Sequence, residues 1–356
     1  MTTRTGSRRP STRPDQRQTE RKPWLVRCAP GLARVALAEL RFRKVIPRTA
    51  GATILRQRNH DLIFLGHVAE QLPGGLLRIP EELHVCPLFG RYKITQSQLD
   101  RLAGVLLARS RPYRLAVTAD GAHFPRQETK FWLTHELQRR HVALTDDPAE
   151  ENVLWMFCVE EAYYFGLSRF TAADADLRDR RVAERQGALP PTIAAALAFL
   201  GEPRPTDTIL DPVCGTGTLL AEAHAYAPEA ALIGVDRDAD ALVAARQNLA
   251  QLRRVHLMRG DGARTGLPAG SVSLVLANLP FGKQFGDRQT NRDLYDRLLD
   301  ELERLAVPDG ARAVLLTSDT VALEGALAAR PRLKAQQRAT VKVRGEVATI
   351  TSVQLS

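Results

Sequence analysis

The sequence has few cysteines and no long apolar run. Its four cysteines, Cys28, Cys86, Cys158 and Cys214, form neither a C-x-x-C metal pair nor the spacing of a disulfide framework. We therefore expect reduced thiols, no bound metal and a cytoplasmic protein. No apolar segment approaches the length of a membrane span, and the N-terminus lacks the apolar core of a secretory signal, so no membrane partner is expected.

Negative charge is in the minority, and the excess of positive charge is unevenly spread. The net charge is +10, and residues 1–22 alone hold seven basic and two acidic side chains. This segment is rich in Thr, Ser, Pro and Gln and is predicted to be a disordered basic tail. Basic chains favour polyanions such as nucleic acids, but a tail of this kind can also serve solubility alone. The oligomeric state stays open, with a monomer as the expectation.

The N-terminal half is predicted to hold two α+β modules, residues 23–88 and 89–168. Strand-like and helix-like periodicities are interleaved in both. The predicted strands are 24–29, 61–65, 113–118, 152–159 and 162–167. The predicted helices are 32–42, 98–108 with Ser97 as its cap, and 128–140 with Phe131, Leu133 and Leu137 facing inward.

The pattern changes after a charged segment, 169–189, which we interpret as a linker. From residue 190 to residue 356, short apolar runs alternate with helical stretches. The runs are 208–210, 231–235, 255–258, 272–277 and 313–317, and the helical stretches are 192–200, 218–226, 238–251 and 292–306. This alternation predicts a doubly wound, mostly parallel α/β sheet, whose ligands bind at the carboxyl ends of the strands.

A glycine-rich turn follows the first strand of this sheet. In Asp211-Pro-Val-Cys-Gly-Thr-Gly-Thr218, Gly215 and Gly217 let the backbone approach a ligand, and the following helix offers free N–H groups. The G-x-x-x-x-G-K-[ST] pattern of a P-loop is absent, and Leu220 occupies the third glycine position of a dinucleotide motif. A tight turn without a ligand remains the alternative when the glycines are taken alone.

Three acidic residues stand at strand ends around this turn. Asp236 ends the second strand roughly 20 residues beyond the glycines, where an acid can bind ribose hydroxyls. Asp261 follows the third strand and suits an adenine amine, and Asp211 can face the ammonium group of an amino acid. Each one alone would more often be a helix cap or a surface acid. Together they match a ligand with an amino-acid end, a ribose and an adenine.

The fourth strand ends with Asn278-Leu-Pro-Phe281-Gly-Lys283. A strand end beside a ligand site is an unusual place for a structural asparagine and an exposed phenylalanine. The alternative is an ordinary turn in which Phe281 packs inward.

The segment 211–218 and Asn278-Leu-Pro-Phe281 together resemble the class I S-adenosylmethionine-dependent amino-methyltransferases. The Cys-Gly-Thr-Gly and Asn-Leu-Pro-Phe-Gly-Lys forms, and segment 187–194, are similar to the RNA guanine-N2 methyltransferases that carry a THUMP domain. The resemblance is specific over 187–286, and within 89–168 it depends on 162–167, which looks like the last THUMP strand. Leu279 departs from the commoner Asn-Pro-Pro-Tyr/Phe form, but the family contact there is made by a backbone carbonyl.

This resemblance implies a Rossmann-like class I methyltransferase domain at 190–356, preceded by ferredoxin-like (23–88) and THUMP-like (89–168) modules. It implies S-adenosylmethionine as the cofactor and tRNA as the partner. The implied cofactor-binding residues are Asp211, Gly215, Thr216, Gly217, Thr218, Asp236, Asp261 and Gly262. The implied catalytic residues are Asn278, Leu279, Pro280 and Phe281. The implied RNA contacts are Lys130, Arg139, Arg140 and Lys283, each of which could equally be a solvated surface charge.

The function expected from the resemblance is methylation of the exocyclic N2 amine of a guanosine in tRNA, with the sixth nucleotide of the acceptor stem as the candidate target. Related enzymes act on guanine in ribosomal RNA, on amines of DNA bases or on a protein glutamine, and the THUMP-like unit disfavours DNA and protein. A further alternative is an RNA-binding protein with a silent methyltransferase fold, against which the intact motifs argue. The target nucleotide and the number of methyl groups transferred stay open.

Overall fold

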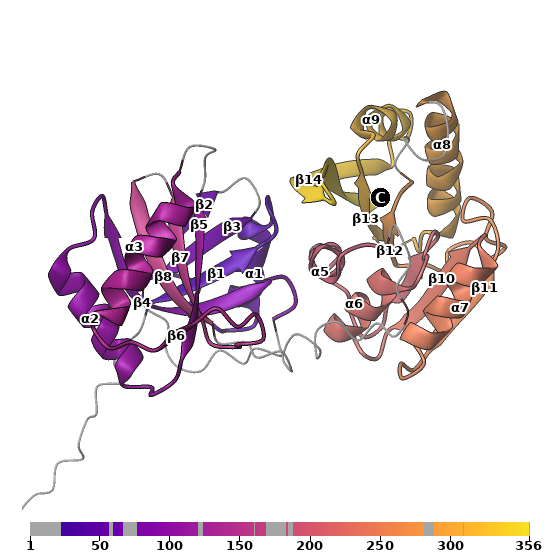
Figure 1. Cartoon of the computed structure of the whole chain (residues 1–356). Helices are drawn as coiled ribbons and strands as arrows, with labels where there is room; N and C mark the ends of the chain where they lie inside the picture. Colours follow the sequence, from indigo (N-terminus) through magenta and orange to yellow (C-terminus); the bar gives the residue numbers. More distant parts are fainter. Residues whose placement is uncertain are drawn as a thin grey trace, which may run out of the picture.

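The computed structural model shows two lobes, each built on one β-sheet (Figure 1). It describes residues 23–56, 60–66, 77–119, 124–159, 161–168, 183, 188–280, 288–308 and 310–355, with the side chains of 288–290 left aside. The predicted tail 1–22 lies outside the described residues, as does the predicted linker except for Ala183, Ala188 and Leu189. No helix in the described part of the chain has both the length and the apolar composition needed to cross a bilayer.

The N-terminal lobe is a mixed sheet of eight strands in the order β2-β3-β1-β4-β8-β7-β5-β6. Its strands are β1 Trp24–Cys28, β2 Ala52–Arg56, β3 Asp61–Leu65, β4 Glu82–Arg91, β5 Tyr113–Ala119, β6 Leu144–Thr145, β7 Val153–Val159 and β8 Ala162–Ser168. Its helices are α1 Ala33–Phe42, α2 Gln96–Leu107 and α3 Arg126–Gln138. Strand β4 crosses the expected boundary at 88/89 and pairs with β1 and β8, so the two predicted modules share one sheet.

Two local predictions in this lobe were wrong. Helix α2 is capped by Thr95 rather than Ser97, because Thr95 and Gln98 form a reciprocal capping box. Phe131 of α3 is 77% exposed, whereas Leu133 and Leu137 are buried as predicted. Leu133 and Leu137 lie four positions apart on one helix face, and Phe131 lies on another.

The C-terminal lobe is a doubly wound sheet in the order β11-β10-β9-β12-β13-β15-β14, as the alternating pattern predicts. Its strands are β9 Thr208–Asp211, β10 Ala231–Asp236, β11 Val255–Arg259, β12 Leu274–Asn278, β13 Arg312–Thr317, β14 Leu333–Val343 and β15 Glu346–Leu355. Its helices are α5 Pro191–Leu200, α6 Thr218–Tyr226, α7 Ala239–Asn248, α8 Arg288–Leu305 and α9 Thr320–Ala328. Strands β9 to β13 run parallel, and β14 and β15 form an antiparallel hairpin at one edge.

Helices cover both faces of this sheet. Apolar side chains of α5, α6 and α7 pack on one face, and those of α8 and α9 pack on the other. The chain order reverses between β9 and β12, because β10 and β11 lie on one side of β9 while β12 and β13 lie on the other. Open α/β sheets bind their ligands at such a switch point, at the carboxyl ends of the strands.

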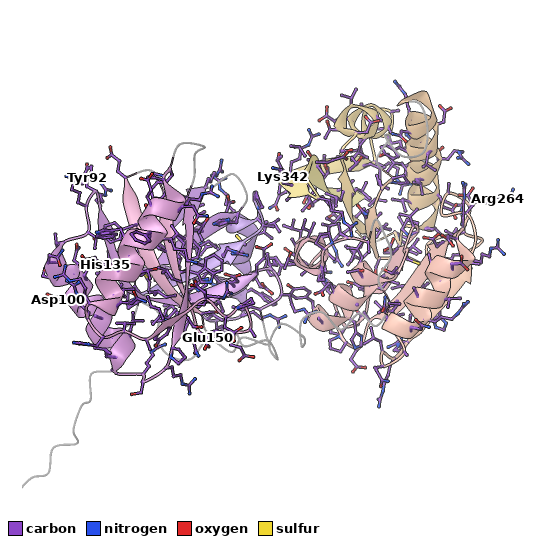
Figure 2. The ribbon with its side chains drawn as sticks, viewed as in Figure 1. Tyr92, Asp100, His135, Glu150, Arg264 and Lys342 are labelled. Carbon is purple, nitrogen blue, oxygen red and sulfur yellow. The ribbon has the colours of Figure 1, made fainter. Side chains whose placement is uncertain are left out.

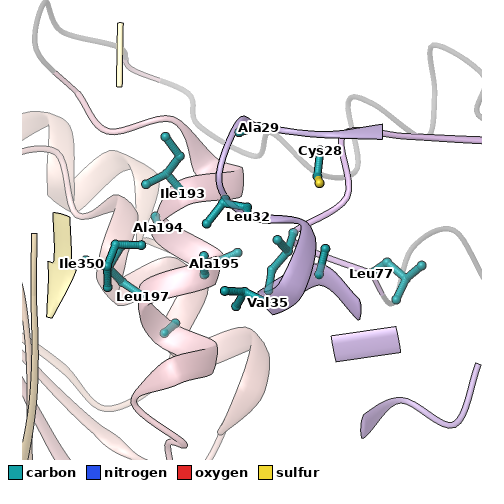
Figure 3. Close-up of a cluster of buried hydrophobic side chains, with 14 of the residues drawn as sticks. Cys28, Ala29, Leu32, Val35, Leu77, Ile193, Ala194, Ala195, Leu197 and Ile350 are labelled. Carbon is teal, nitrogen blue, oxygen red and sulfur yellow. The ribbon is translucent and has the colours of Figure 1, made fainter. Parts of the chain in front are cut away.

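The two lobes share one apolar cluster. Leu32 and Val35 of the N-terminal lobe pack with Ile193 and Leu197 of α5 and with Ile350 of β15 (Figure 3). The contact is also close at backbone level, because a Cβ added to Gly31 would lie 1.8 Å from the carbonyl oxygen of Thr340 in β14. Gly31 adopts a φ of 89°, which a glycine accepts readily. The turn before α1 therefore stands directly against the edge of the C-terminal sheet.

A buried polar group reinforces this junction. The Glu39 carboxylate, fully buried on α1, accepts the backbone N–H groups of Arg78 and Ile79 at 3.1 and 3.0 Å and the Tyr226 hydroxyl at 2.7 Å. The Arg78 guanidinium in turn donates to both oxygens of Glu222 at 2.8 and 2.6 Å. Tyr226 and Glu222 belong to α6, the helix that follows the glycine turn, so the junction ends on an element of the candidate site.

Candidate active site

The strand register brings the predicted residues to one edge of the C-terminal sheet. Asp211 ends β9 and pairs with Gly234 of β10, two residues before Asp236. Asn278 ends β12, the neighbour of β9 on its other side, and Asp261 follows β11. Residues far apart in the sequence therefore meet at the switch point, as expected.

The glycine turn has the backbone conformation that its sequence predicts. Gly215 adopts a φ of 51°, and a Cβ placed there would meet nothing within 4 Å, so the space beside it is open. Its N–H donates to Oδ2 of Asp236 at 2.7 Å. Gly262 lies on the other side of the turn, where an added Cβ would come within 2.0 Å of the Pro212 carbonyl oxygen. The turn thus leaves room for a ligand at Gly215 and is closely packed at Gly262.

Asp211 is a buried carboxyl group, only 1% exposed. Its pKa is raised from 3.8 to about 8: burial is the largest cause, the hydrogen bond that the Val213 N–H donates acts to lower it, and the neighbouring Asp236 acts to raise it. A carboxyl group in this setting gains most from a cation placed beside it. This matches the ammonium group of an amino-acid ligand.

The other two acids also shape the protein. Asp236 accepts the Asp238 N–H at 2.9 Å as well as that of Gly215, so it holds the turn in place. Burial acts to raise the pKa of Asp261, but hydrogen bonds from the Ala263 N–H and Arg237 lower it below its ordinary value. Arg237 lies 2.6 Å from Oδ2 of Asp261. The sequence predicted ligand contacts for both acids and missed these supporting roles.

Thr216 and Thr218 are buried, with their hydroxyl oxygens 3.4 Å apart. Sequence reasoning missed the residue that holds Thr216. Asn248 of α7 donates to the Thr216 carbonyl at 3.0 Å and to the Ala183 carbonyl at 3.0 Å, and its side-chain oxygen accepts the Ala183 N–H. Asn248 therefore ties the glycine turn to a residue of the predicted linker.

Asn278 carries the most informative atom of the site. Its Oδ1 is buried and has no hydrogen-bond partner among the described residues. A buried acceptor left without a donor costs about 1–3 kcal/mol, so this oxygen would gain from a donor that a ligand brings to the sheet edge. The next residue continues the ladder, with the Leu279 N–H donating to the Leu316 carbonyl at 2.9 Å. Phe281 and Lys283 lie outside the described residues.

The predicted RNA contacts of the N-terminal lobe differ in their availability. Arg140 follows the end of α3 and donates to Glu136 at 2.7 Å and to Asp100 of α2 at 2.8 Å. It joins two helices of the lobe. Asp100 is labelled in Figure 2 on the N-terminal lobe. Lys130 faces the exposed Asp146 at 3.4 Å, and Arg139 is two-thirds exposed. Lys130 and Arg139 are therefore the freer of the three cations.

Comparison with known proteins agrees with this geometry. Residues 178–349 match the model of the family described as RMKL-like, methyltransferase domain. The human protein named tRNA (guanine(6)-N(2))-methyltransferase THUMP3 is 33% identical over 156 residues, which is 39% of this chain and 31% of the human protein. A Thermus thermophilus tRNA (guanine(6)-N2)-methyltransferase is 33% identical over 40% of this chain and 43% of its own length. A bovine U6 snRNA (guanine-N(2))-methyltransferase, THUMPD2, is 36% identical over 36% of this chain and 25% of its own. The chain thus spans less than half of each of these relatives.

Comparison with solved structures finds similarity over both lobes of the chain. The crystal structure of TrmN from Thermus thermophilus superposes with a TM-score of 0.78 at 22% identity, covering 94% of this chain and all of that one. The chain has a class I methyltransferase fold with an N-terminal α+β lobe. A Listeria monocytogenes protein described as a predicted N6-adenine-specific DNA methylase gives a TM-score of 0.66 at 16% identity over 93% of this chain and 95% of that one. The methyltransferase fold is shared by proteins described with different substrates, so the fold alone does not identify the substrate. The substrate has to be inferred from the residues of the site.

Proposed function

We propose that this chain transfers a methyl group from S-adenosylmethionine to the N2 amine of a guanosine in tRNA, with nucleotide 6 as the target. The observation that carries the proposal is the buried, unpartnered Oδ1 of Asn278 at the sheet edge that also holds Asp211 and the glycine turn. The names of the human, bovine and Thermus relatives support guanine N2 as the acceptor, and two of them specify guanine 6 of tRNA.

The site fits the proposed cofactor on its own chemistry. S-adenosylmethionine supplies an activated methyl group when bound. Asp211 would hold its ammonium group, because a buried carboxyl with a raised pKa is stabilised by a cation. The open space beside Gly215 would admit the amino-acid portion, Asp236 would accept from the ribose hydroxyls, and Asp261 would accept from the adenine amine.

The acceptor amine needs orientation more than a base. Its lone pair is delocalised into the guanine ring, so it is a weak nucleophile. The Asn278 Oδ1 and the Leu279 carbonyl would accept its two N–H groups and leave the lone pair directed away from them. Orientation of this kind can contribute several of the roughly 7–11 kcal/mol that positioning supplies in total. Phe281 would stack on the base, worth about 1–3 kcal/mol.

The N-terminal lobe would select the RNA, with 23–88 acting as a ferredoxin-like module and 89–168 as a THUMP-like module. Lys130 and Arg139 are available for phosphate contacts there, whereas Arg140 is already bonded between α2 and α3. Lys283 would contact phosphate near the target base. The shared apolar cluster and the Glu39–Tyr226 hydrogen bond would hold the N-terminal lobe in a fixed orientation relative to the candidate site.

The proposal is tested by supplying methyl-labelled S-adenosylmethionine with unmodified tRNA, ribosomal RNA or U6 snRNA, followed by nucleoside analysis of the product. Labelled N2-methylguanosine at nucleotide 6 of tRNA is the expected result. Label in another RNA or in another nucleoside would overturn the substrate assignment. Cofactor binding without label in any RNA would overturn the proposed function.

Replacing Asn278 tests the residue that carries the proposal. Asn278→Ala is expected to lower kcat at least about 100-fold, because the amine loses the acceptor that orients it. The cofactor dissociation constant, measured by calorimetry, should change less than about threefold. Gln251→Ala removes an exposed amide of the same domain and serves as the control, with unchanged kcat expected. A loss of cofactor binding equal to the loss of kcat would contradict the assigned role.

A further inference from the structure

Tyr295 of α8 connects the candidate catalytic strand end to the neighbouring strand. Its side chain is fully buried, with an exposed fraction of 0%. Its hydroxyl donates to the Pro280 carbonyl at 2.7 Å and lies 2.7 Å from Oγ1 of Thr317, the last residue of β13. Pro280 is two residues beyond Asn278. Neither Tyr295 nor Thr317 stands out in the sequence, since both occupy positions typical of a core helix and a core strand.

The direction of each hydrogen bond follows from counting protons. A carbonyl oxygen can only accept, so the single hydroxyl proton of Tyr295 goes to Pro280. Thr317 must then donate its own proton to the Tyr295 oxygen. The Asp319 N–H donates to Oγ1 of Thr317 at 2.9 Å. The result is a directed chain from Asp319 through Thr317 and Tyr295 to the Pro280 carbonyl, and such chains strengthen each bond by polarisation.

Both ends of this chain are anchored. Asp319 caps α9 by accepting the Ala322 N–H at 3.1 Å, and its other oxygen accepts the Asn291 side-chain amide at 3.1 Å. At the other end, the Tyr295 ring belongs to an apolar cluster with Leu279 and Leu298. Without the tyrosine hydroxyl, the Pro280 carbonyl would lose this donor, and the strand end would relax to find another.

We propose that Tyr295 and Thr317 are positioning residues for Asn278–Pro280. Their hydrogen-bond chain fixes the direction of the strand end, and with it the Asn278 Oδ1 and the Leu279 carbonyl. The proposal rests on the proposed function for its catalytic consequence. The positioning itself is a property of the protein alone.

Three substitutions separate positioning from packing. Tyr295→Phe and Thr317→Val keep the shape of the side chain and remove the hydroxyl, whereas Thr317→Ser keeps the hydroxyl and removes a methyl group. We expect kcat to fall about 10- to 100-fold in the first two, as displacement of reacting groups does elsewhere, and to stay within about threefold in Thr317→Ser. The KM for RNA and the cofactor dissociation constant should stay within about twofold. Tyr113→Phe, which alters a buried tyrosine of the N-terminal sheet, is the matched control.

Amide hydrogen exchange of the peptide covering 274–280, measured without RNA, keeps the two proposals distinguishable. Faster exchange at Leu279 in Tyr295→Phe and Thr317→Val, but not in Thr317→Ser or Tyr113→Phe, supports positioning even if the wild-type protein methylates none of the RNAs. Unchanged exchange together with unchanged kcat in Tyr295→Phe overturns it. An equal loss of kcat in all three site variants, with a matching loss of cofactor affinity, also overturns it, because that pattern indicates general damage to the fold.

Discussion

At the scale of single residues, the sequence predicted the identities at the sheet edge but not their environments. Asp211, Asp236 and Asn278 meet because parallel strands end at the same edge, which the spacing alone indicates. The complete burial of Asp211 depends on the packing of both neighbouring strands and could not be predicted. Tyr295 was missed because a tyrosine at a core position of a helix is expected to contribute its ring to packing. The sequence does not show that its hydroxyl donates to the Pro280 carbonyl.

The raised pKa of Asp211 makes cofactor binding depend on pH. The folded-state pKa of about 8 lies above the ordinary value of 3.8, so the free carboxyl group is mostly protonated at pH 7. An ammonium ligand binds the ionised form, so binding should release about one proton and tighten up to about tenfold per unit between pH 6 and pH 7. Calorimetry in buffers of different ionisation enthalpy measures the proton release.

Asp211→Asn should bind the cofactor more weakly, with no proton release and little pH dependence in this range. The same shift has a consequence for the protein without ligand. Stability linked to the protonated carboxyl is fully present below pH 4 and is lost as pH rises toward 8, so the asparagine variant should gain stability relative to wild type at pH 8. A wild-type affinity that is flat from pH 6 to pH 7 would contradict the buried-acid interpretation.

At the scale of elements, the start of α2 shows how a small pattern decides between two good caps. Thr95 and Ser97 both favour the N-cap position, but a glutamine three residues later follows only Thr95. The Gln98 N–H donates to the Thr95 hydroxyl at 3.3 Å, and the Thr95 N–H donates to the Gln98 side chain at 2.9 Å. The helix therefore starts two residues before the predicted position.

Thr95→Ala should lower the free energy of unfolding by about 0.5–2 kcal/mol, the usual loss on removing an N-cap. Ser97→Ala, two residues further along, should change it by less than about 0.5 kcal/mol. Urea denaturation of both variants against wild type makes the comparison. Equal effects, or a larger effect at Ser97, would show that the capping box does not control this helix end.

The C-terminal lobe was the easier half to predict because its strands alternate with amphipathic helices. The predicted strands and helices of residues 190–317 were confirmed, with shifts of a few residues at their ends. Strands β14 and β15 were not predicted, because residues 333–343 are largely polar and exposed and form a strand only through pairing with β15. Strand β2 was not predicted either, and it pairs along its length with β3.

At the scale of the whole molecule, the junction between the lobes could not be predicted. The rest of the N-terminal lobe and the predicted linker separate α1 from α5 in the sequence, yet both helices contribute to one apolar cluster (Figure 3). The predicted division into separate modules does not show that Glu39, Arg78 and Tyr226 meet in a buried polar group. A chain cut after residue 168 would expose this face, so point substitutions test it better than truncation does.

Arg78→Met should lower the free energy of unfolding by about 3–5 kcal/mol, because Glu222 is left charged and buried. The double variant Arg78→Met/Glu222→Met should recover much of that loss, since neither charge remains. Arg338→Met breaks an exposed pair with Glu324 and should cost less than about 1 kcal/mol. Comparable losses for Arg78→Met and Arg338→Met would show that the junction pair is not specially stabilising.

The contact of Gly31 with β14 has a consequence for solubility. Strand β14 is the outermost strand of the C-terminal sheet, and an open strand edge is a template on which a second chain can pair. The turn of the N-terminal lobe stands against its backbone at Thr340 and occupies part of that edge. The N-terminal lobe therefore also protects the C-terminal sheet: separating the two lobes would uncover a strand edge and an apolar face together, and self-association would compete with re-docking.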